Sequence, residues 1–126
     1  MDNNQLPVKV KAVLIEIKEA LFRFQETGQP WTLFIDKMAL AFEERKAIRD
    51  FLGQGDVTVN FKDEYEPVEW LESGVAGVWY GVFYNASGKP ILETIEVSAF
   101  PELAAAQHDD TATGIQAIAA KLNSLN

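Results

Sequence analysis

The stretch from Gly77 to Pro101 constrains the fold of this chain more than any other. It predicts two β-strands joined by a tight turn at Asn85–Gly88, because Asn and Gly tolerate positive φ. Apolar side chains occupy both faces of the first strand: Val78, Tyr80, Val82 and Tyr84 on one, Trp79 and Phe83 on the other. A strand that is apolar on both faces is usually central in its sheet and covered on each side.

The second strand of this hairpin carries two glutamates. Glu93 shares a face with Ile91, Ile95 and Val97, whereas Glu96 alternates to the opposite face. The odd spacing therefore prevents the two carboxylates from acting as an acid–base pair. Three explanations for Glu93 stay open: a place near the strand end, a pairing with Lys89, or a bulge that displaces it.

Composition excludes several classes of chemistry. The 126 residues include no Cys and a single His, His108, so zinc or iron ligation by this chain is a poor fit. A net charge of −8 makes nucleic acid and anionic membrane surfaces poor partners.

The glycines of Gly53-Gln54-Gly55 follow a predicted helix and precede a strand, the reverse of a dinucleotide fingerprint. We therefore expect no catalytic, cofactor-binding or metal-binding residues, and a protein that is not an enzyme.

The remaining pattern predicts one α+β domain over residues 1–126. Helices are expected over residues 7–27 and 42–52, in a short piece ending at residue 106, and after His108-Asp109-Asp110. Strands are expected near residues 32–35, 57–61 and 66–72 and in the hairpin. The predicted order is α-β-α-β-β-β-β-α-α, a mostly antiparallel sheet of about five strands with flanking helices. The start of the chain lacks the features of a signal peptide, which favours a cytoplasmic location.

Two features suggest surfaces for protein partners. Ile15 and Phe22 lie off the apolar stripe of the first helix and project together from nearly its opposite side. An acidic run without Lys or Arg follows the predicted strand at 57–61 and comprises Asp63, Glu64, Glu66, Glu69 and Glu72. Such a run could meet a basic partner surface.

Each of these features also has a simpler explanation. The C-terminal helix or a second copy of the chain could cover Ile15 and Phe22, and the acidic run could be a solvated loop. A small-ligand-binding or enzymatic domain is the alternative function. It would use a pocket beside the 77–98 hairpin, with Trp79, Tyr80, Phe83, Glu93 and Glu96 near it.

Several segments, taken in order, resemble the C-terminal domain of the HupH/HyaF hydrogenase expression and formation proteins. They are Glu-Thr-Gly-Gln-Pro at 26–30, Leu-Phe-Ile-Asp-Lys-Met-Ala-Leu at 33–40, Phe-Leu-Gly-Gln-Gly-Asp-Val at 51–57, Gly-Val-Trp-Tyr at 77–80, Asn-Ala-Ser-Gly at 85–88 and Ile-Glu-Val-Ser-Ala-Phe-Pro at 95–101. Ala41 departs from the capping Ser that members tend to have at this place. Better-known members are longer, with additional sequence before this domain.

The resemblance implies an accessory, chaperone-like role in the maturation of uptake [NiFe]-hydrogenase. The implied partners are a hydrogenase subunit precursor, other hydrogenase maturation proteins, or both, with a homodimer as a further possible arrangement. This role agrees with an acidic chain that has spare apolar surface and no evident catalytic constellation.

Overall fold

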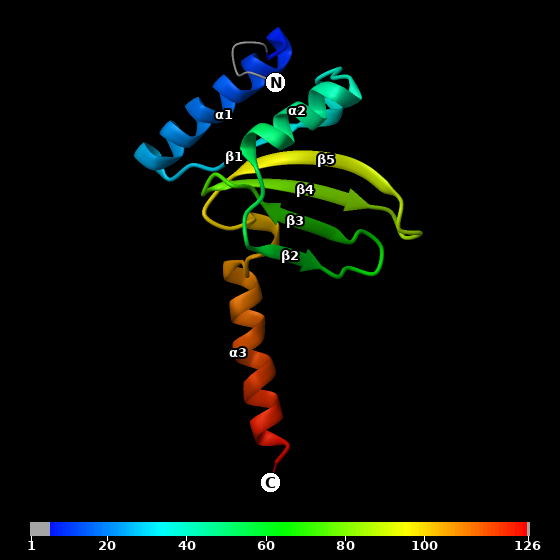
Figure 1. Ribbon diagram of the computed structural model, residues 1–126. Helices are drawn as coiled ribbons and strands as arrows, with labels where there is room; N and C mark the ends of the chain where they lie inside the picture. Colours follow the sequence, from blue (N-terminus) through cyan, green and yellow to red (C-terminus); the bar gives the residue numbers. More distant parts are fainter. Residues whose placement is uncertain (1–5, 126) are drawn as a thin grey trace.

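A five-stranded antiparallel sheet forms the centre of the structure, a computed structural model that describes residues 6–125 (Figure 1). The strands are β1 (Trp31–Phe34), β2 (Thr58–Phe61), β3 (Val68–Glu72), β4 (Val78–Tyr84) and β5 (Pro90–Val97). Their order in the sheet is β1-β5-β4-β3-β2. The expected α+β class and element order are confirmed, and β4 is the central strand as its two apolar faces predict.

Within residues 6–125 the sheet is joined by three α-helices and two short 3₁₀ helices. The helices are α1 (Val8–Thr27), α2 (Phe42–Leu52) and α3 (His108–Asn123), and the 3₁₀ turns are η2 (Ile35–Lys37) and η3 (Glu102–Ala104). Both α1 and α2 end at a glycine, Gly28 and Gly53, each with φ above 70°. Positive φ suits glycine because it has no Cβ to clash with the backbone.

The main core lies between the sheet and the pair α1 and α2. Alternation along β4 and β5 directs Val78, Tyr80, Ile95 and Val97 to this side. The helical residues that meet them are buried at spacings of three and four and comprise Val10, Val13, Ile17 and Ala20 of α1 and Ile48 and Leu52 of α2. The apolar stripe on α1 therefore holds it on the sheet.

The opposite face of the sheet has a smaller core, and among the described elements no α-helix packs on it. Trp70 and Trp79 are nearly fully buried there, and the Trp79 indole N–H donates to the carbonyl oxygen of Ser98 at 3.1 Å. The segment after β5 is the cover, with the Phe100 ring edge-on to Trp79 at 6.0 Å. The expected cover on both sides of β4 thus comes from helices on one side and from a short irregular segment on the other.

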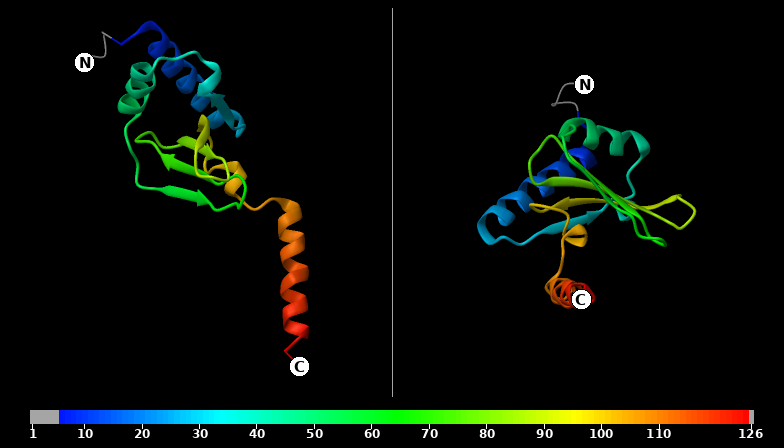
Figure 2. Two further views of the ribbon diagram at one scale, coloured as in Figure 1. Left: turned by 90° about the vertical axis from the view of Figure 1, so that its right-hand side faces the viewer. Right: turned by 90° about the horizontal axis from the view of Figure 1, so that it is seen from below.

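The last helix does not cover the first. Every residue of α3 is exposed, and the helix projects from the side of the sheet opposite α1 (Figures 1 and 2). The prediction that α3 covers Ile15 and Phe22 within the same chain is therefore wrong.

Gly81 allows Trp70 to lie against the middle of β4. A Cβ at Gly81 would come 2.4 Å from the Thr94 hydroxyl oxygen and 3.1 Å from the Trp70 indole nitrogen. We expect Gly81→Ala to lower the free energy of unfolding by about 1–3 kcal/mol, since an added methyl overpacks this site. Urea denaturation measures the change.

Gly114→Ala is the matched control, because nothing lies within 4 Å of a Cβ at that position on α3. This variant should be neutral or more stable, since Ala favours a helix over Gly by about 1 kcal/mol. Equal stability of Gly81→Ala and the parent chain would contradict the role assigned to Gly81.

Candidate protein-binding surface

The solvent-facing side of α1 carries apolar side chains, whereas this side of an amphipathic helix is normally polar. Ile15 is 50% exposed and Phe22 is 65% exposed. They are seven residues apart and so lie on one side of the helix, about 10 Å apart along its axis. The sequence prediction that both side chains point away from the core is confirmed.

A groove of about 460 Å³ lies beside Ile15, between α1, the end of α2 and the turn that follows β3. Its walls are mostly apolar and are formed by Leu6, Leu14, Ile15, Ile17, Leu21, Phe51, Leu52 and Val75, with Lys11 and Lys18 among the lining residues. Phe22 lines an adjacent depression that shares Lys18 and Leu21 with this groove. We call the groove, Ile15 and Phe22 together the α1 surface.

The spacing of apolar residues in α2 did not predict the groove. That spacing places Phe51 on the inner side of the helix with Phe42, Ile48 and Leu52. The prediction is wrong for Phe42, which is 78% exposed at the start of the helix. In the structure Phe51 is 48% exposed and lines the groove, while Ile48 and Leu52 are buried. A residue at the margin of an apolar stripe can face a core or a groove, and only the neighbouring helix decides which.

The acidic run does not join the α1 surface. Asp63, Glu64 and Glu66 lie in the turn between β2 and β3, at the edge of the sheet. The Asp63 carboxylate accepts hydrogen bonds from the backbone N–H groups of Tyr65 at 3.1 Å and Glu66 at 2.8 Å, so it shapes this turn.

The other two acidic residues of the run lie in β3. Glu69 is opposite Val82, on the side of α1 and α2, and Glu72 ends the strand opposite Trp79. Three of the five carboxylates thus lie in a turn, and the other two lie in β3 on opposite faces of the sheet. Of the three carboxylates in the turn, Asp63 shapes it through its hydrogen bonds, and Glu64 and Glu66 are exposed.

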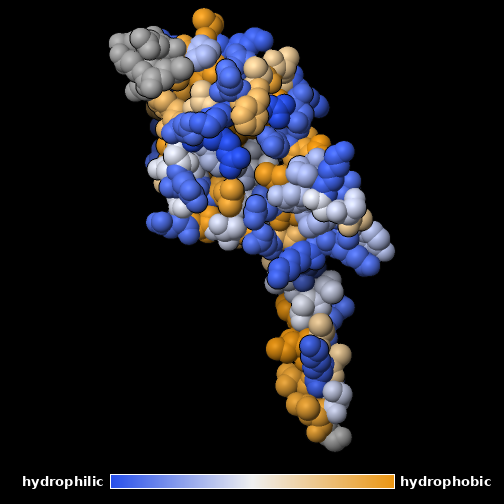
Figure 3. Space-filling model, turned by 45° about the vertical axis from the view of Figure 1, so that its right-hand side comes forward, coloured by the Kyte–Doolittle hydropathy of each residue, from blue (hydrophilic) through white to orange (hydrophobic). Residues whose placement is uncertain are grey.

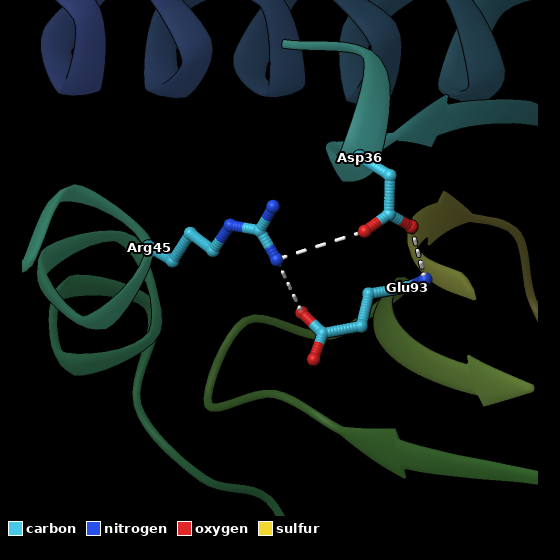
Figure 4. Close-up of polar contacts among 3 residues, drawn as sticks. All are labelled: Asp36, Arg45 and Glu93. Carbon is cyan, nitrogen blue, oxygen red and sulfur yellow. Dashed lines mark hydrogen bonds and ion pairs between the residues drawn. The ribbon is translucent and has the colours of Figure 1, made fainter. Parts of the chain in front are cut away.

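Glu93 has a structural partner that the sequence did not identify. Its carboxylate lies 3.5 Å from the Arg45 guanidinium of α2, which also lies 3.7 Å from Asp36 of η2 (Figure 4). The Asp36 carboxylate in turn accepts a hydrogen bond from the Glu93 backbone N–H at 2.8 Å. These contacts join α2, η2 and β5, and Arg45 rather than Lys89 accounts for Glu93.

Glu96 is the buried carboxylate of the hairpin. It is 8% exposed and accepts hydrogen bonds from the Ser98 hydroxyl at 2.8 Å and from the Glu102 backbone N–H at 3.0 Å. These bonds attach η3 to β5. Because Glu93 and Glu96 lie on opposite sides of the sheet, the prediction that they cannot act as a pair is confirmed.

Tyr80, one of the residues of the proposed hairpin pocket, borders a depression. This hollow of about 410 Å³ is also lined by Arg49, Asp50 and Leu71. Burial raises the pKa of Tyr80 to about 12, with smaller opposing effects of the Arg49 and Asp50 charges. The phenol therefore stays protonated near neutral pH, where it donates to the Arg49 carbonyl oxygen at 3.3 Å. Trp79 and Glu96 lie on the other side of the sheet and cannot contribute to this hollow.

Within residues 6–125, no three His, Asp or Glu side chains gather in a way that could hold a metal ion. Among the helices that the structure describes, none is both long enough and apolar enough to cross a membrane.

Comparisons with known proteins agree with one another. A family model described as HupH hydrogenase expression protein, C-terminal conserved region, matches residues 8–125. The chain is 28% identical over 100 residues to the hydrogenase expression/formation protein HupQ of Azotobacter chroococcum mcd 1, a match that covers 78% of this chain and 35% of that protein. It is also 28% identical over 103 residues to the hydrogenase expression/formation protein HupH of Rhizobium leguminosarum bv. viciae, covering 82% and 36%.

A solved structure is also similar. The hydrogenase expression protein HupH from Thiobacillus denitrificans ATCC 25259 superimposes with a TM-score of 0.87 at 28% identity, covering 94% of this chain and 98% of that one. The curated relatives are longer: the matches span only 35% and 36% of their lengths, about a third.

The raised pKa of Tyr80 predicts a loss of stability in alkali. Between pH 10 and about 12 the unfolded chain releases the Tyr80 proton while the folded chain retains it, so the free energy of unfolding falls as pH rises. Tyr80→Phe should remove this part of the decline. Chemical denaturation at several pH values, together with ultraviolet titration of the tyrosines, measures both effects.

Tyr65→Phe is the control, because Tyr65 is 68% exposed. It should leave the alkaline decline as steep as in the parent chain. The assignment fails if Tyr80→Phe and Tyr65→Phe show the same slope above pH 10.

Proposed function

The chain belongs to the HupH hydrogenase expression protein family, in its C-terminal conserved region, and we propose that it acts by binding other proteins during hydrogenase maturation. The family match over residues 8–125 carries this proposal. The hydrogenase is of the uptake [NiFe] type, and the chain is an accessory, chaperone-like factor rather than an enzyme. Its proposed location is the cytoplasm.

The α1 surface supports binding through protein contacts. Its apolar side chains line a groove and lie exposed beside it, and a monomer rarely leaves a large apolar area uncovered without use. Lys11 and Lys18 line this groove in a chain whose net charge is −8, and neither forms an ion pair within the described residues. The groove therefore suits an apolar segment with acidic flanks in a hydrogenase subunit precursor or in another maturation protein.

The acidic turn of Glu64 and Glu66 is a second, smaller contact area. The turn lies away from the α1 surface, and its negative charge suits a basic partner surface. Exposed charges of this kind raise the association rate more than the affinity. A homodimer is also part of the proposal, and it need not use either of these areas.

The ligand-binding alternative finds less support. It requires Trp79, Tyr80, Phe83, Glu93 and Glu96 to surround one pocket, whereas strand alternation divides them between two sides of the sheet. Glu93 is paired with Arg45, and Glu96 is engaged by Ser98 and Glu102.

Capture experiments test the role of the α1 surface. The parent chain, used as bait, should enrich a hydrogenase subunit precursor or another maturation protein from cells that express the hydrogenase genes. Ile15→Glu and Phe22→Glu should each reduce the enrichment about 10-fold or more, because a charge would be buried at the centre of the contact. Quantitative mass spectrometry of the captured proteins provides the readout.

Phe42→Glu is the matched control. Phe42 is 78% exposed at the start of α2 and does not line the groove, so the same change in charge and polarity should leave capture intact. Circular dichroism confirms that each bait is folded. A folded parent bait that enriches no hydrogenase-related protein would refute the function, and equal capture by Ile15→Glu would refute the surface alone.

A further inference from the structure

The last helix carries an apolar stripe that the described part of the chain leaves exposed. Ile115, Ile118, Leu122 and Leu125 are each 60–79% exposed and recur at spacings of three and four residues. In Figure 3 hydrophobic residues follow one side of the projecting helix, and more hydrophilic residues lie beside them on the face in view. We call residues 108–125 the arm.

A helix of this kind needs a packing partner. The arm contains Gly114 and two threonines, which are weaker helix formers than Ala, and isolated helices of such length are marginal in water. Most helical stability in proteins comes from packing of the apolar face. The arm also lies within the region matched by the family model, which extends to residue 125.

The α1 groove of the same chain cannot provide that packing, because the arm leaves from the opposite side of the sheet (Figure 1). We propose that the occupant is a second copy of this chain, with the two arms paired antiparallel along their apolar stripes. The spacing of Ile115, Ile118, Leu122 and Leu125 matches alternate a and d positions over two heptads, the pattern of a helix–helix seam.

Charge complementarity selects the antiparallel direction. Asp110 in the first turn and Lys121 in the last turn lie on the same flank of the stripe, 11 residues apart on a helical net of 3.6 residues per turn. When two arms overlap along their full length, Asp110 of one arm lies beside Lys121 of the partner subunit, twice over. In a parallel pair the equivalent flanks lie on opposite sides of the seam, and Asp110 and Lys121 lie at different heights along it, so neither Asp110 would meet Lys121 of the partner subunit.

The base of the arm offers a seat for the tip of the other arm. Phe100 is 45% exposed and Leu103 is 56% exposed, and a hollow of about 500 Å³ lies between this segment and the end of α1. Full antiparallel overlap brings Leu125 of the partner subunit to this base. The apolar stripe and the apolar base are thereby covered by the same contact.

The size of this contact suits a specific dimer. An arm helix of 16 residues is about 24 Å long, and two of them paired and seated at both ends would bury on the order of 1,000 Å². This is near the lower limit for specific protein interfaces, so we expect a reversible dimer with a micromolar dissociation constant.

Sedimentation or light scattering across a concentration series tests the dimer in the full chain. The parent chain should pass from monomer to dimer, and Ile118→Asp should raise the dissociation constant about 100-fold or more, since it places two carboxylates in the seam. Gln116→Asp is the matched control: it lies on the opposite side of the same helix and should still form the dimer. A monomeric parent chain, or a dimeric Ile118→Asp variant, overturns the proposal.

Disulfide formation tests the direction of the arms, because the sequence has no Cys. In full antiparallel overlap Thr111 lies opposite Leu122 of the partner subunit. A mixture of Thr111→Cys and Leu122→Cys chains should therefore form a mixed disulfide dimer under mild oxidation, while neither variant crosslinks efficiently alone. Efficient crosslinking of Thr111→Cys with itself would show parallel arms and refute the arrangement.

The dimer and the proposed function can fail separately. Ile118→Asp leaves the α1 surface unchanged, so its capture of hydrogenase-related proteins should persist in a monomer. If the parent chain is monomeric and Ile118→Asp alone abolishes that capture, the arm binds a different protein and the dimer proposal is wrong.

Discussion

Burial of β4 on both faces is the constraint on which the rest of the structure depends. On one face its side chains meet α1 and α2, and on the other they meet Trp70 and the segment that follows β5. The close approach of Trp70 requires a residue without a side chain at position 81, which is why a glycine interrupts an otherwise bulky strand. The other strands pair outward from β4, with β5 and then β1 on one side and β3 and then β2 on the other.

The same alternation that builds the core keeps the polar groups of the hairpin apart. Glu93 and Glu96 reach opposite sides of the sheet, and each ties a different element to β5: Arg45 of α2 with Asp36 of η2 on one side, and η3 on the other. These carboxylates are used to hold the fold together. Because these polar groups are engaged within the fold, the side chains left available for binding are exposed apolar residues and exposed charges at the surface.

The elements could be predicted from sequence because their patterns are local. Apolar periodicity in α1 and two-sided apolarity in β4 each follow from the residues within one element. The exposure of Ile15 and Phe22 follows from the same helical period. Pairings between distant elements could not be predicted this way: the Arg45–Glu93 contact joins residues 48 positions apart, and the groove beside Ile15 depends on how α2 ends against α1.

The course of the arm is the largest difference between expectation and structure. Its amphipathic pattern indicates a helix with one buried side, but the pattern does not specify which surface does the burying. The acidic run shows the same limit, since five neighbouring carboxylates in sequence are divided between a turn and two sides of a strand. Residues that are close in sequence can therefore lie on opposite faces of a strand, so a charged run in the sequence need not form a charged patch on the surface.

The arm and the α1 surface lie at opposite ends of the molecule (Figures 1 and 2). Two chains joined through antiparallel arms would therefore present their α1 surfaces outward, too far apart to hold one small protein between them. Such an assembly is a bivalent bridge. It would bring two client molecules together, or bind a client that displays its site twice far more tightly than one chain could, because the second contact forms at a high effective concentration.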